Sequence, residues 1–232
     1  MKFINCENIS FSYDKTDVID NISFEIEEND TVGIIGANGS GKTTLFKLLL
    51  GLEKPNNGKI NIDEKELNKK NLDEIRKKVG FVFQDSDNQL FMNTVEDEIA
   101  FVLYNKGLDE KVIKSKVDNI LDELDIKDLR YRRIIQLSGG EKKLVAIASI
   151  LVMEPEVLLL DEPTNALDPR YRRRIIELLN KIKCTKIIAS HDLDMISKTC
   201  SKTILLYKGK IVKEGKTTEI LTHEKDLIKY GL

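Results

Sequence analysis

The sequence has 232 residues, of which 33% are charged and 41% hydrophobic, the balance of an ordinary soluble globular protein with room for one sizeable α/β domain or two small ones. Its net charge of −2 provides no overall basic field that would favour nucleic acid or anionic lipid. The longest apolar run, 144–153, is shorter than the ~20 residues of a membrane-spanning helix, and no secretory signal pattern opens the sequence.

The first thirty residues alternate apolar and polar positions, which predicts short antiparallel strands with turns near Asp14–Lys15 and 28–30. A Pro-Asn-Asn turn precedes residues 58–63, which would add another strand to that sheet. Two continuous apolar runs, at 31–35 and 79–83, have the character of buried strands.

A helix is predicted between these two buried strands, because apolar residues recur at helical spacing after residue 44. Gly51 is a suitable residue to end it. The apolar face of this helix consists of Leu45, Leu48, Leu49 and Leu52.

From about 88 to 154 the pattern becomes helical, which indicates a helical subdomain inserted between parallel strands. Thr94 with Asp97, and later Asp109, have the pattern of helix N-caps. The apolar positions at helical spacing are Val95, Ile99, Val102, Leu103, Ile113, Val117, Ile120, Leu121, Leu124, Leu144, Ile147, Ala148 and Leu151. We predict that residues 1–232 form one α/β domain that carries this subdomain.

Strands and helices alternate in the last third of the chain. Buried strands are predicted at 157–160 and 186–190, and Asp168 followed by a proline predicts the start of a helix between them. A hairpin is expected over 203–213, then a short helix near 218–221 and a polar tail. The three cysteines of the sequence have no metal-ligand spacing, which fits packing in a reducing compartment.

Residues 36–44 fit the phosphate-binding pattern G-x-x-x-x-G-K-[ST] between a predicted strand and a predicted helix. Glycines let the backbone point successive N–H groups at phosphate oxygens, and the helix start adds its positive dipole end. Lys42 would reach the β- and γ-phosphates, and the Thr43 hydroxyl would ligate Mg²⁺. The alternative, a glycine-rich turn that binds nothing, is disfavoured by the strand–loop–helix order. The residues of the loop are Gly36, Ala37, Asn38, Gly39, Ser40, Gly41, Lys42, Thr43 and Thr44.

Asp161 and Glu162 end a strand of four apolar residues. A carboxylate in the position of Asp161 can hold Mg²⁺ across from a phosphate loop. Strand side chains alternate in direction, so Glu162 would point elsewhere and could act as the base toward the water that attacks the γ-phosphate. The alternative is an acidic, solvated strand end.

Leu137-Ser138-Gly139-Gly140-Glu141 is a second specific pattern. Ser138 and Glu141 alone make a capping box before a helix. The same arrangement places a hydroxyl and the Gly139 and Gly140 amides at a helix N-terminus, which favours anions. The two interpretations are compatible.

In their order along the chain, these motifs resemble those of the ATP-binding cassette (ABC) ATPase family, and the resemblance covers nearly the whole chain. It implies a P-loop NTPase core with an antiparallel β subdomain and an inserted helical subdomain, which binds ATP and Mg²⁺ and hydrolyses ATP. It also implies a head-to-tail dimer, in which each ATP lies between one subunit's 36–44 and the other's Ser138-Gly139-Gly140. The matching segments are 36–44, Gln84, 137–141, 158–163, 165–168 and His191.

The resemblance also implies roles for single residues. Tyr13 would stack on adenine, and Gln84 would contact both Mg²⁺ and the attacking water. His191 would hold the γ-phosphate and Glu162. Asp168 would lie at the dimer seam, although its role as a helix cap is equally well supported by the residues.

Two positions depart from the family pattern. Asn165 stands where the family often has serine, and Leu144 where it often has arginine. Neither replaces a group that touches phosphate or metal, so hydrolysis is still expected.

Residues 83–98 resemble the corresponding segment in the ATPase subunits of energy-coupling-factor (ECF) importers. These importers take up vitamins or cobalt and nickel ions. This resemblance implies a second ABC ATPase subunit (identical or sister), an integral membrane coupling subunit that docks near Gln84–Glu98, and a substrate-binding membrane subunit. The chain would then be peripheral, on the cytoplasmic face of the cell membrane. Leu90, Phe91 and Met92 suit such docking, unless they are core of the helical subdomain. Because only a short segment follows the last hairpin, we expect the chain to resemble the shorter, metal- or biotin-type subunits more.

Three other functions compete. The first is a soluble ABC ATPase acting on nucleic acid or in translation. The basic cluster of Arg170 and 172–174 could contact phosphate, but such a cluster is typical of a solvated helix face. We therefore expect no nucleic-acid partner. A module that only binds ATP would lack Lys42, Asp161 or Glu162, yet all three are present. The chain could also be the ATPase subunit of another ABC transporter type.

Overall fold

The computed structural model describes residues 2–222 and 224–232. The chain divides into two compact units. Unit 1 contains Met1–Val79, Glu156–Glu162 and Lys183–Leu232, and unit 2 contains Gly80–Pro155 and Pro163–Ile182. The helical subdomain expected at about 88–154 falls within unit 2, whereas a single domain over 1–232 stays a prediction.

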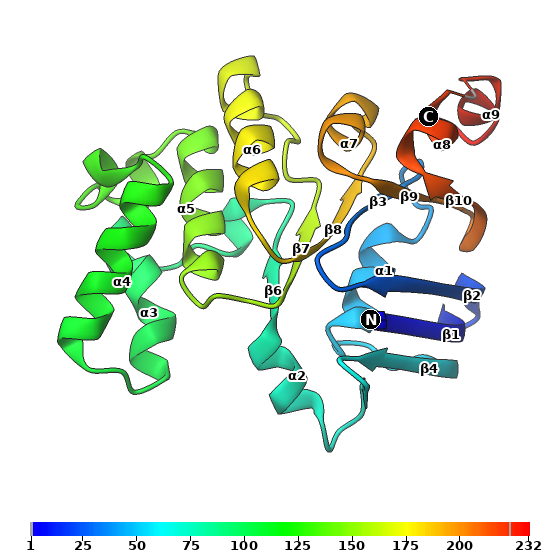
Figure 1. Cartoon of the computed structure of the whole chain (residues 1–232), viewed down its shortest axis with the longest axis horizontal. Coiled ribbons are helices and arrows are strands. Elements are labelled where there is room, and N and C mark those ends of the chain that lie inside the picture. Colours follow the sequence, from blue (N-terminus) through cyan, green and yellow to red (C-terminus); the bar gives the residue numbers. More distant parts are fainter. Residues whose placement is uncertain (1, 223) are drawn as a thin grey trace. The chain divides into compact units, whose positions relative to one another are not determined.

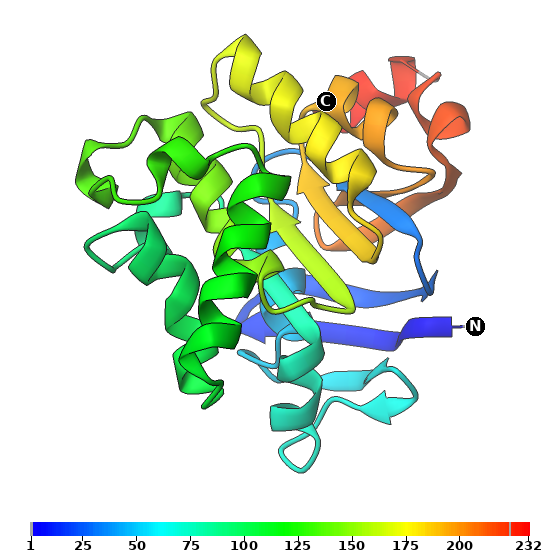
Figure 2. The ribbon, with the colours of Figure 1, turned by 60° about the vertical axis from the view of Figure 1, so that its left-hand side comes forward.

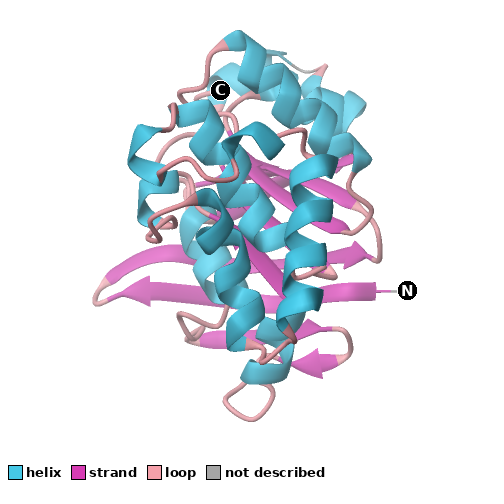
Figure 3. Cartoon of the chain, turned by 90° about the vertical axis from the view of Figure 1, so that its left-hand side faces the viewer, coloured by secondary structure: helices cyan, strands magenta, loops and turns pink. Residues whose placement is uncertain are grey.

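Unit 1 contains an antiparallel sheet with the strand order β2-β1-β4-β5, whose two long strands are prominent in Figure 3. β1 and β2 pair antiparallel, as predicted, but each has 12 residues and neither is short. Asp14 makes the turn between them with a left-handed φ of 51°, which an aspartate tolerates better than most residues. The strands are β1 (Lys2–Tyr13), β2 (Thr16–Glu27), β4 (Asn57–Ile62) and β5 (Lys65–Glu66).

The second sheet of unit 1 brings three strand ends to one edge. Its strands follow the order β10-β9-β3-β8-β7, with β3, β7 and β8 parallel (Figure 2). Ile35 pairs with Ser190 and Asp161 with Ala189, so the loops after these three strands leave from the same edge. The bounds are β3 (Thr31–Ile35), β7 (Val157–Asp161), β8 (Thr185–Ser190), β9 (Lys202–Tyr207) and β10 (Lys210–Lys216).

The helices of unit 1 correct two expectations and add two elements that were not predicted. Leu52 does not share the apolar face of α1; it is 58% exposed, because α1 ends at Leu49 and Gly51 turns the chain at a φ of +60°. The polar tail is in fact helix α9, and Leu227 in it is buried. Helices α2 and α7 have no predicted counterpart. The bounds are α1 (Lys42–Leu49), α2 (Leu72–Lys78), α7 (Leu193–Thr199), α8 (Thr217–Leu221) and α9 (Glu224–Lys229).

Unit 2 is mainly helical. The helices α3, α4 and α5 pack on one another, in green in Figure 1, and α6 packs on α5. The predicted cap residues Thr94, Asp109 and Asp168 all accept hydrogen bonds from their own helices. Strand β6 (Val79–Val82) leads into this unit from unit 1. The bounds of the helices are α3 (Val95–Asn105), α4 (Glu110–Glu123), α5 (Gly139–Leu151) and α6 (Pro169–Lys181).

Between residues 2 and 222 and between 224 and 232, none of the helices combines the length and apolar character that crossing a membrane requires.

Candidate active site

The phosphate loop joins β3 to α1, as the sequence predicts. Its first glycine is enclosed: a Cβ at Gly36 would lie 2.3 Å from the Leu206 carbonyl oxygen and 2.6 Å from Ser40 Oγ. Gly41 has a φ of +108°, which strains any other residue, whereas a Cβ at Gly39 would meet nothing within 4 Å. The loop is therefore closely packed at its two ends and open at Gly39.

Helix α1 starts without a capping side chain. Its N-cap is Gly41, and no side chain of the described residues bonds the first amides. The helices α3, α4, α5, α6 and α7 are each capped by a Thr, Asp or Ser side chain, whereas the short helices α2 and α8, like α1, are not. The first N–H groups of a helix need external acceptors. At α1 they are free to take phosphate oxygens.

Ser40 adds a further donor to the loop. Its hydroxyl is buried and has no hydrogen-bond partner among residues 2–222 and 224–232. An unmatched buried hydroxyl beside uncapped amides fits a site that an anion completes.

The Lys42 ammonium folds back over the loop. Nζ donates to the carbonyl oxygens of Gly36 at 2.7 Å and Ala37 at 3.3 Å, and lies 3.8 Å from Glu162 Oε1. Burial lowers the pKa of Lys42, and the charges of Glu162 and Asp161 oppose that shift. The ammonium is thus held at the loop, close to the Glu162 carboxylate.

Thr43 and Asp161 meet across the edge of the parallel sheet. Thr43 Oγ1 donates to Asp161 Oδ2 at 2.9 Å, and Asp161 is buried at the end of β7. A hydroxyl and a carboxylate are oxygen donors of the kind that Mg²⁺ prefers. The donor set fits the ion.

Glu162 is fixed by the end of β8. Its carboxylate accepts from Ser190 Oγ at 2.8 Å and from the His191 N–H at 3.1 Å, and His191 Nδ1 lies 2.9 Å from Oε1. Strand alternation is not what separates Glu162 from Asp161, because Glu162 lies beyond β7 in a left-handed conformation with φ of 45°. That conformation turns the side chain toward β8.

Tyr13 lies at the end of β1 in the same unit, 37% exposed. Its ring packs edge-on against Phe11 at 4.8 Å, and Lys47 Nζ lies 5.7 Å from the ring centre. The exposed ring leaves area for a stacking partner.

The other predicted residues lie in unit 2. Ser138 caps α5 in a full capping box: its Oγ accepts from Glu141 N at 3.3 Å, and Glu141 Oε2 accepts from Ser138 N at 2.7 Å. Partial burial raises the pKa of Glu141, but the hydrogen bonds from Ser138 and the Arg132 charge outweigh it, so the net pKa is lowered. A Cβ at Gly140 would lie 2.2 Å from the Tyr171 ring, whereas Gly139 is open.

Gln84 is exposed in unit 2, and its carbonyl oxygen accepts from Lys143 Nζ at 2.8 Å. The structure thus brings together Lys42, Thr43, Asp161, Glu162 and His191 within unit 1. Sequence reasoning missed Ser190, for which the signal was a polar residue at the end of a buried strand directly before His191.

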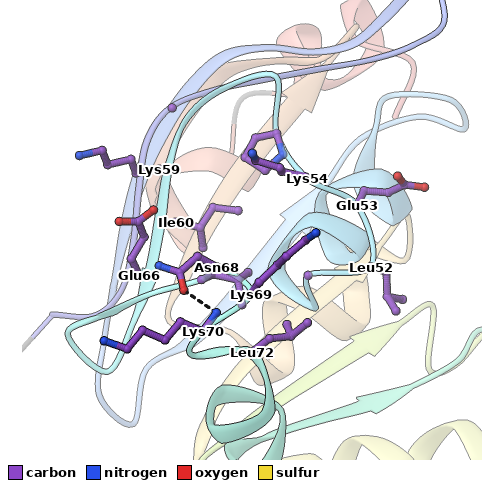
Figure 4. Close-up of a pocket in the computed structure, with 14 residues that line it drawn as sticks. Leu52, Glu53, Lys54, Lys59, Ile60, Glu66, Asn68, Lys69, Lys70 and Leu72 are labelled. Atoms are coloured by element: carbon purple, nitrogen blue, oxygen red, sulfur yellow. Dashed lines mark hydrogen bonds between the residues drawn. The ribbon is translucent and has the colours of Figure 1, made fainter.

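A hollow of about 620 Å³ lies elsewhere in unit 1. It shares no residue with the phosphate loop, and its lining includes the lysines 54, 59, 69 and 70 together with Ile60 and Leu72, which are labelled in Figure 4. The sequence contains no motif that assigns a function to it.

Known proteins are similar to this chain in both sequence and fold. The family model described as "ABC transporter" matches residues 19–165. A putative ABC transporter ATP-binding protein of Caldanaerobacter subterraneus is 45% identical, with 100% of this chain and 99% of that protein covered. The energy-coupling factor transporter ATP-binding protein EcfA of Carboxydothermus hydrogenoformans is 42% identical, with 99% and 86% covered.

A solved structure has the same fold. It is cbiO1 of Clostridium perfringens, described as part of the ABC transporter complex cbiONQ, with a TM-score of 0.89 and 36% identity over 98% of this chain and 94% of that one. Fold and site thus define a nucleotide-hydrolysing P-loop protein. The chain belongs to the ABC transporter family of ATP-binding proteins, as an ATPase subunit of a transporter.

Proposed function

We propose that this protein powers an ECF-type importer of a small solute, a metal ion or a vitamin. It would work as a head-to-tail dimer with an identical or sister ATPase, together with a membrane coupling subunit and a substrate-binding membrane subunit. Its place would be peripheral, on the cytoplasmic face of the membrane. The identity to EcfA and the likeness to cbiO1 support this assignment over other transporter types.

The chemistry that we assign to the site is ATP hydrolysis by positioning and charge stabilisation. The loop amides and Lys42 would hold the phosphates, with Tyr13 on the adenine. Glu162 would take the proton of the attacking water, because its carboxylate is buried and oriented by Ser190 and His191. Ser138, Gly139 and Gly140 would complete the partner subunit's site, so an isolated monomer should bind ATP and scarcely hydrolyse it.

Thr43 and Asp161 would hold the Mg²⁺ ion, since their oxygens meet at 2.9 Å. The bound ion would neutralise charge that develops on the phosphates. Gln84, which we also predict near the ion, lies in unit 2, and its role there stays a prediction.

The observation that carries the importer assignment is the exposure of Phe91. Its side chain is 65% exposed, while Leu90 beside it is buried. The Phe91 ring packs edge-on against Phe101 at 4.9 Å, and Tyr104, one turn further along α3, is 58% exposed. Exposed aromatic residues are typical of a protein interaction site. Phe91 follows the Gln84 loop closely, which suits contact with an apolar helix of a membrane subunit.

Phe91→Asp tests this docking role. The variant should fold, with an unchanged melting temperature, because Phe91 contributes little to the core. It should no longer co-purify with membrane subunits that are recovered with the unmodified chain. Tyr131→Asp is the matched control, since Tyr131 is a 74% exposed aromatic residue of unit 2 outside the segment. Equal recovery of membrane subunits with both variants would contradict the assignment.

Nucleic acid is not among the partners that we propose. The basic cluster on α6 is not a uniform patch, because Arg174 Nη2 donates to the Leu124 carbonyl at 2.7 Å. A salt-dependent affinity for DNA would favour the competing function.

A further inference from the structure

We propose that Lys143 and Gln89 fasten the Gln84 segment, residues 83–89, to helix α5, so that Phe91 follows the movement of Ser138. Both are positioning residues and neither is expected to touch nucleotide. The inference rests on the proposed function, in which Ser138 contacts ATP and Phe91 contacts the membrane partner.

Lys143 makes the first connection. It is 2% exposed, and its Nζ donates to the carbonyl oxygens of Phe83 and Gln84, both at 2.8 Å. A buried ammonium is costly unless its donors are used, and carbonyls of this segment take two of them. Lys143 lies four residues after Gly139, about 6 Å along the helix axis from the helix start.

Gln89 makes the second connection, and here a side chain of the segment bonds to helix α5. Its Oε1 accepts from the Phe83 N–H at 3.1 Å, and its Nε2 donates to the Ala146 carbonyl at 2.7 Å and to Ser149 Oγ at 3.3 Å. Lys143, Ala146 and Ser149 recur at intervals of three along α5, so the contacts lie near one face of the helix. The segment is thus held to α5 over about two turns.

The connection continues to Phe91. Leu90 N donates to the Ser86 carbonyl at 2.9 Å, which closes a turn before Phe91. The N–H groups of Phe91 and Met92 then donate to Glu98 Oε2 at 2.9 and 2.8 Å. Glu98 is only 5% exposed, so this carboxylate is a fixed anchor. Hydrogen bonds therefore hold the chain at both ends of the stretch between Gln84 and Phe91.

A segment fixed in this way transmits displacement. Packed elements joined by buried hydrogen bonds move as a body more readily than they deform. A shift of α5 when nucleotide reaches Ser138 would therefore appear at Phe91 with little loss. Without Lys143 or Gln89, the two ends of the connection would move independently.

Phe91→Trp supplies a fluorescent reporter, because the sequence contains no tryptophan. We expect its emission to change when a non-hydrolysable ATP analogue and Mg²⁺ are added. Lys143→Met, or Gln89→Leu if the first variant does not fold, should reduce that change by about fivefold or more, as expected when coupling energy is lost. Binding of a fluorescent ATP analogue should persist in each variant.

Lys142→Met is the matched control. Lys142 is the neighbouring lysine of α5, and its ion pair with Asp87 at 2.6 Å also joins α5 to the Gln84 segment, but this pair is partly exposed. Surface pairs contribute little, so the emission change of the reporter should remain. Hydrogen exchange of the amides in 83–92 should be faster by about tenfold in Lys143→Met, because local opening loses its anchor, and not in Lys142→Met.

The outcomes separate the two proposals. If the reporter emission responds to nucleotide and still responds fully in Lys143→Met and Gln89→Leu, the connection is overturned and the docking role survives. If the emission does not respond in the chain with Lys143 and Gln89 intact, the coupling function of this segment is overturned, and the connection with it.

Discussion

His191 Nδ1 lies 2.9 Å from Glu162 Oε1, and the His191 backbone N–H lies 3.1 Å from the same oxygen. One residue thus holds the carboxylate both through its ring and through its backbone. Because Glu162 leaves β7 with a left-handed φ of 45°, the end of β8 determines where the carboxylate points. The proposed base is therefore oriented by a strand other than its own.

Replacing Glu162 with glutamine should abolish turnover while ATP binding persists. The amide keeps the size of the side chain but cannot take a proton, and a positioned general base contributes about 10²–10⁴ in rate. Phosphate release measured beside equilibrium nucleotide binding checks this, and ATP-dependent dimers should accumulate.

Glu156→Gln is the control for that experiment, since Glu156 directly precedes the same strand but is paired in solvent with Lys78. It should leave turnover unchanged. Hydrolysis at the normal rate in Glu162→Gln would remove the assigned role of Glu162.

Ser190→Ala should lower turnover by about tenfold, since one hydrogen bond to a charged group is worth roughly 1.5–3 kcal/mol. The Ser190 hydroxyl donates to Glu162 Oε2 at 2.8 Å and is fully buried. Ser197→Ala removes a comparable serine, whose Oγ donates to the Asp194 carbonyl on the exposed side of α7, and should leave the rate unaltered. Equal rates in the two variants would show that Ser190 does not orient the base.

Gly140→Ala should destabilise the protein and Gly139→Ala should not. The Cβ added at Gly140 would lie 2.2 Å from the Tyr171 ring, whereas nothing lies within 4 Å at Gly139. Overpacking costs about 1–3 kcal/mol, so the melting temperature should fall by roughly 2–10 °C. Alanine suits the first turn of α5 better than glycine, so the Gly139 variant should melt at or above the parent temperature. A fall in both would mean that contact with Tyr171 is not the cause.

The three thiols should resist alkylation in the folded protein. Burial raises the pKa of Cys200 to about 11, against weaker lowering by the Thr199 hydrogen bond and the Lys186 charge, and burial also raises the pKa of Cys6. At pH 8 only about one Cys200 in a thousand would be thiolate, the nucleophilic form.

A chromogenic thiol reagent should therefore react with three thiols only in denaturant. Because the folded pKa of Cys200 exceeds the unfolded one, its contribution to stability is complete below about pH 8.5 and should be lost as the pH rises toward 11. Rapid reaction of the native protein at pH 8 would mean that these side chains open to solvent.

Patterns in the sequence predicted the elements with strong periodicity and clear caps. The helices that begin after Thr94, Asp109 and Asp168 start where predicted. Helix α2 was missed because only Ile75 in it is buried, which leaves no apolar stripe to recognise. Leu52 continued a helical spacing, but spacing cannot reveal that Gly51 has already turned the chain.

The site was predictable in kind more than in detail. Motif spacing identified Lys42, Asp161 and Glu162, because the chemistry of phosphate transfer needs those groups. The conformation of Glu162 was not predictable, since a left-handed glutamate carries no sequence signal of its own. Ser190 was missed for a related reason: it acts through a neighbouring strand that only the register of β7 and β8 brings alongside.

The uncapped start of α1 connects the cellular concentration of ATP to the lifetime of the protein. An occupant that supplies the missing acceptors stabilises the folded state by roughly 2.7 kcal/mol when its concentration is about a hundred times its dissociation constant. A cell rich in ATP would thus hold this protein in a form that proteases attack slowly, and starvation would expose it. Energy status would then regulate not only how fast the subunit works but how many copies of it survive.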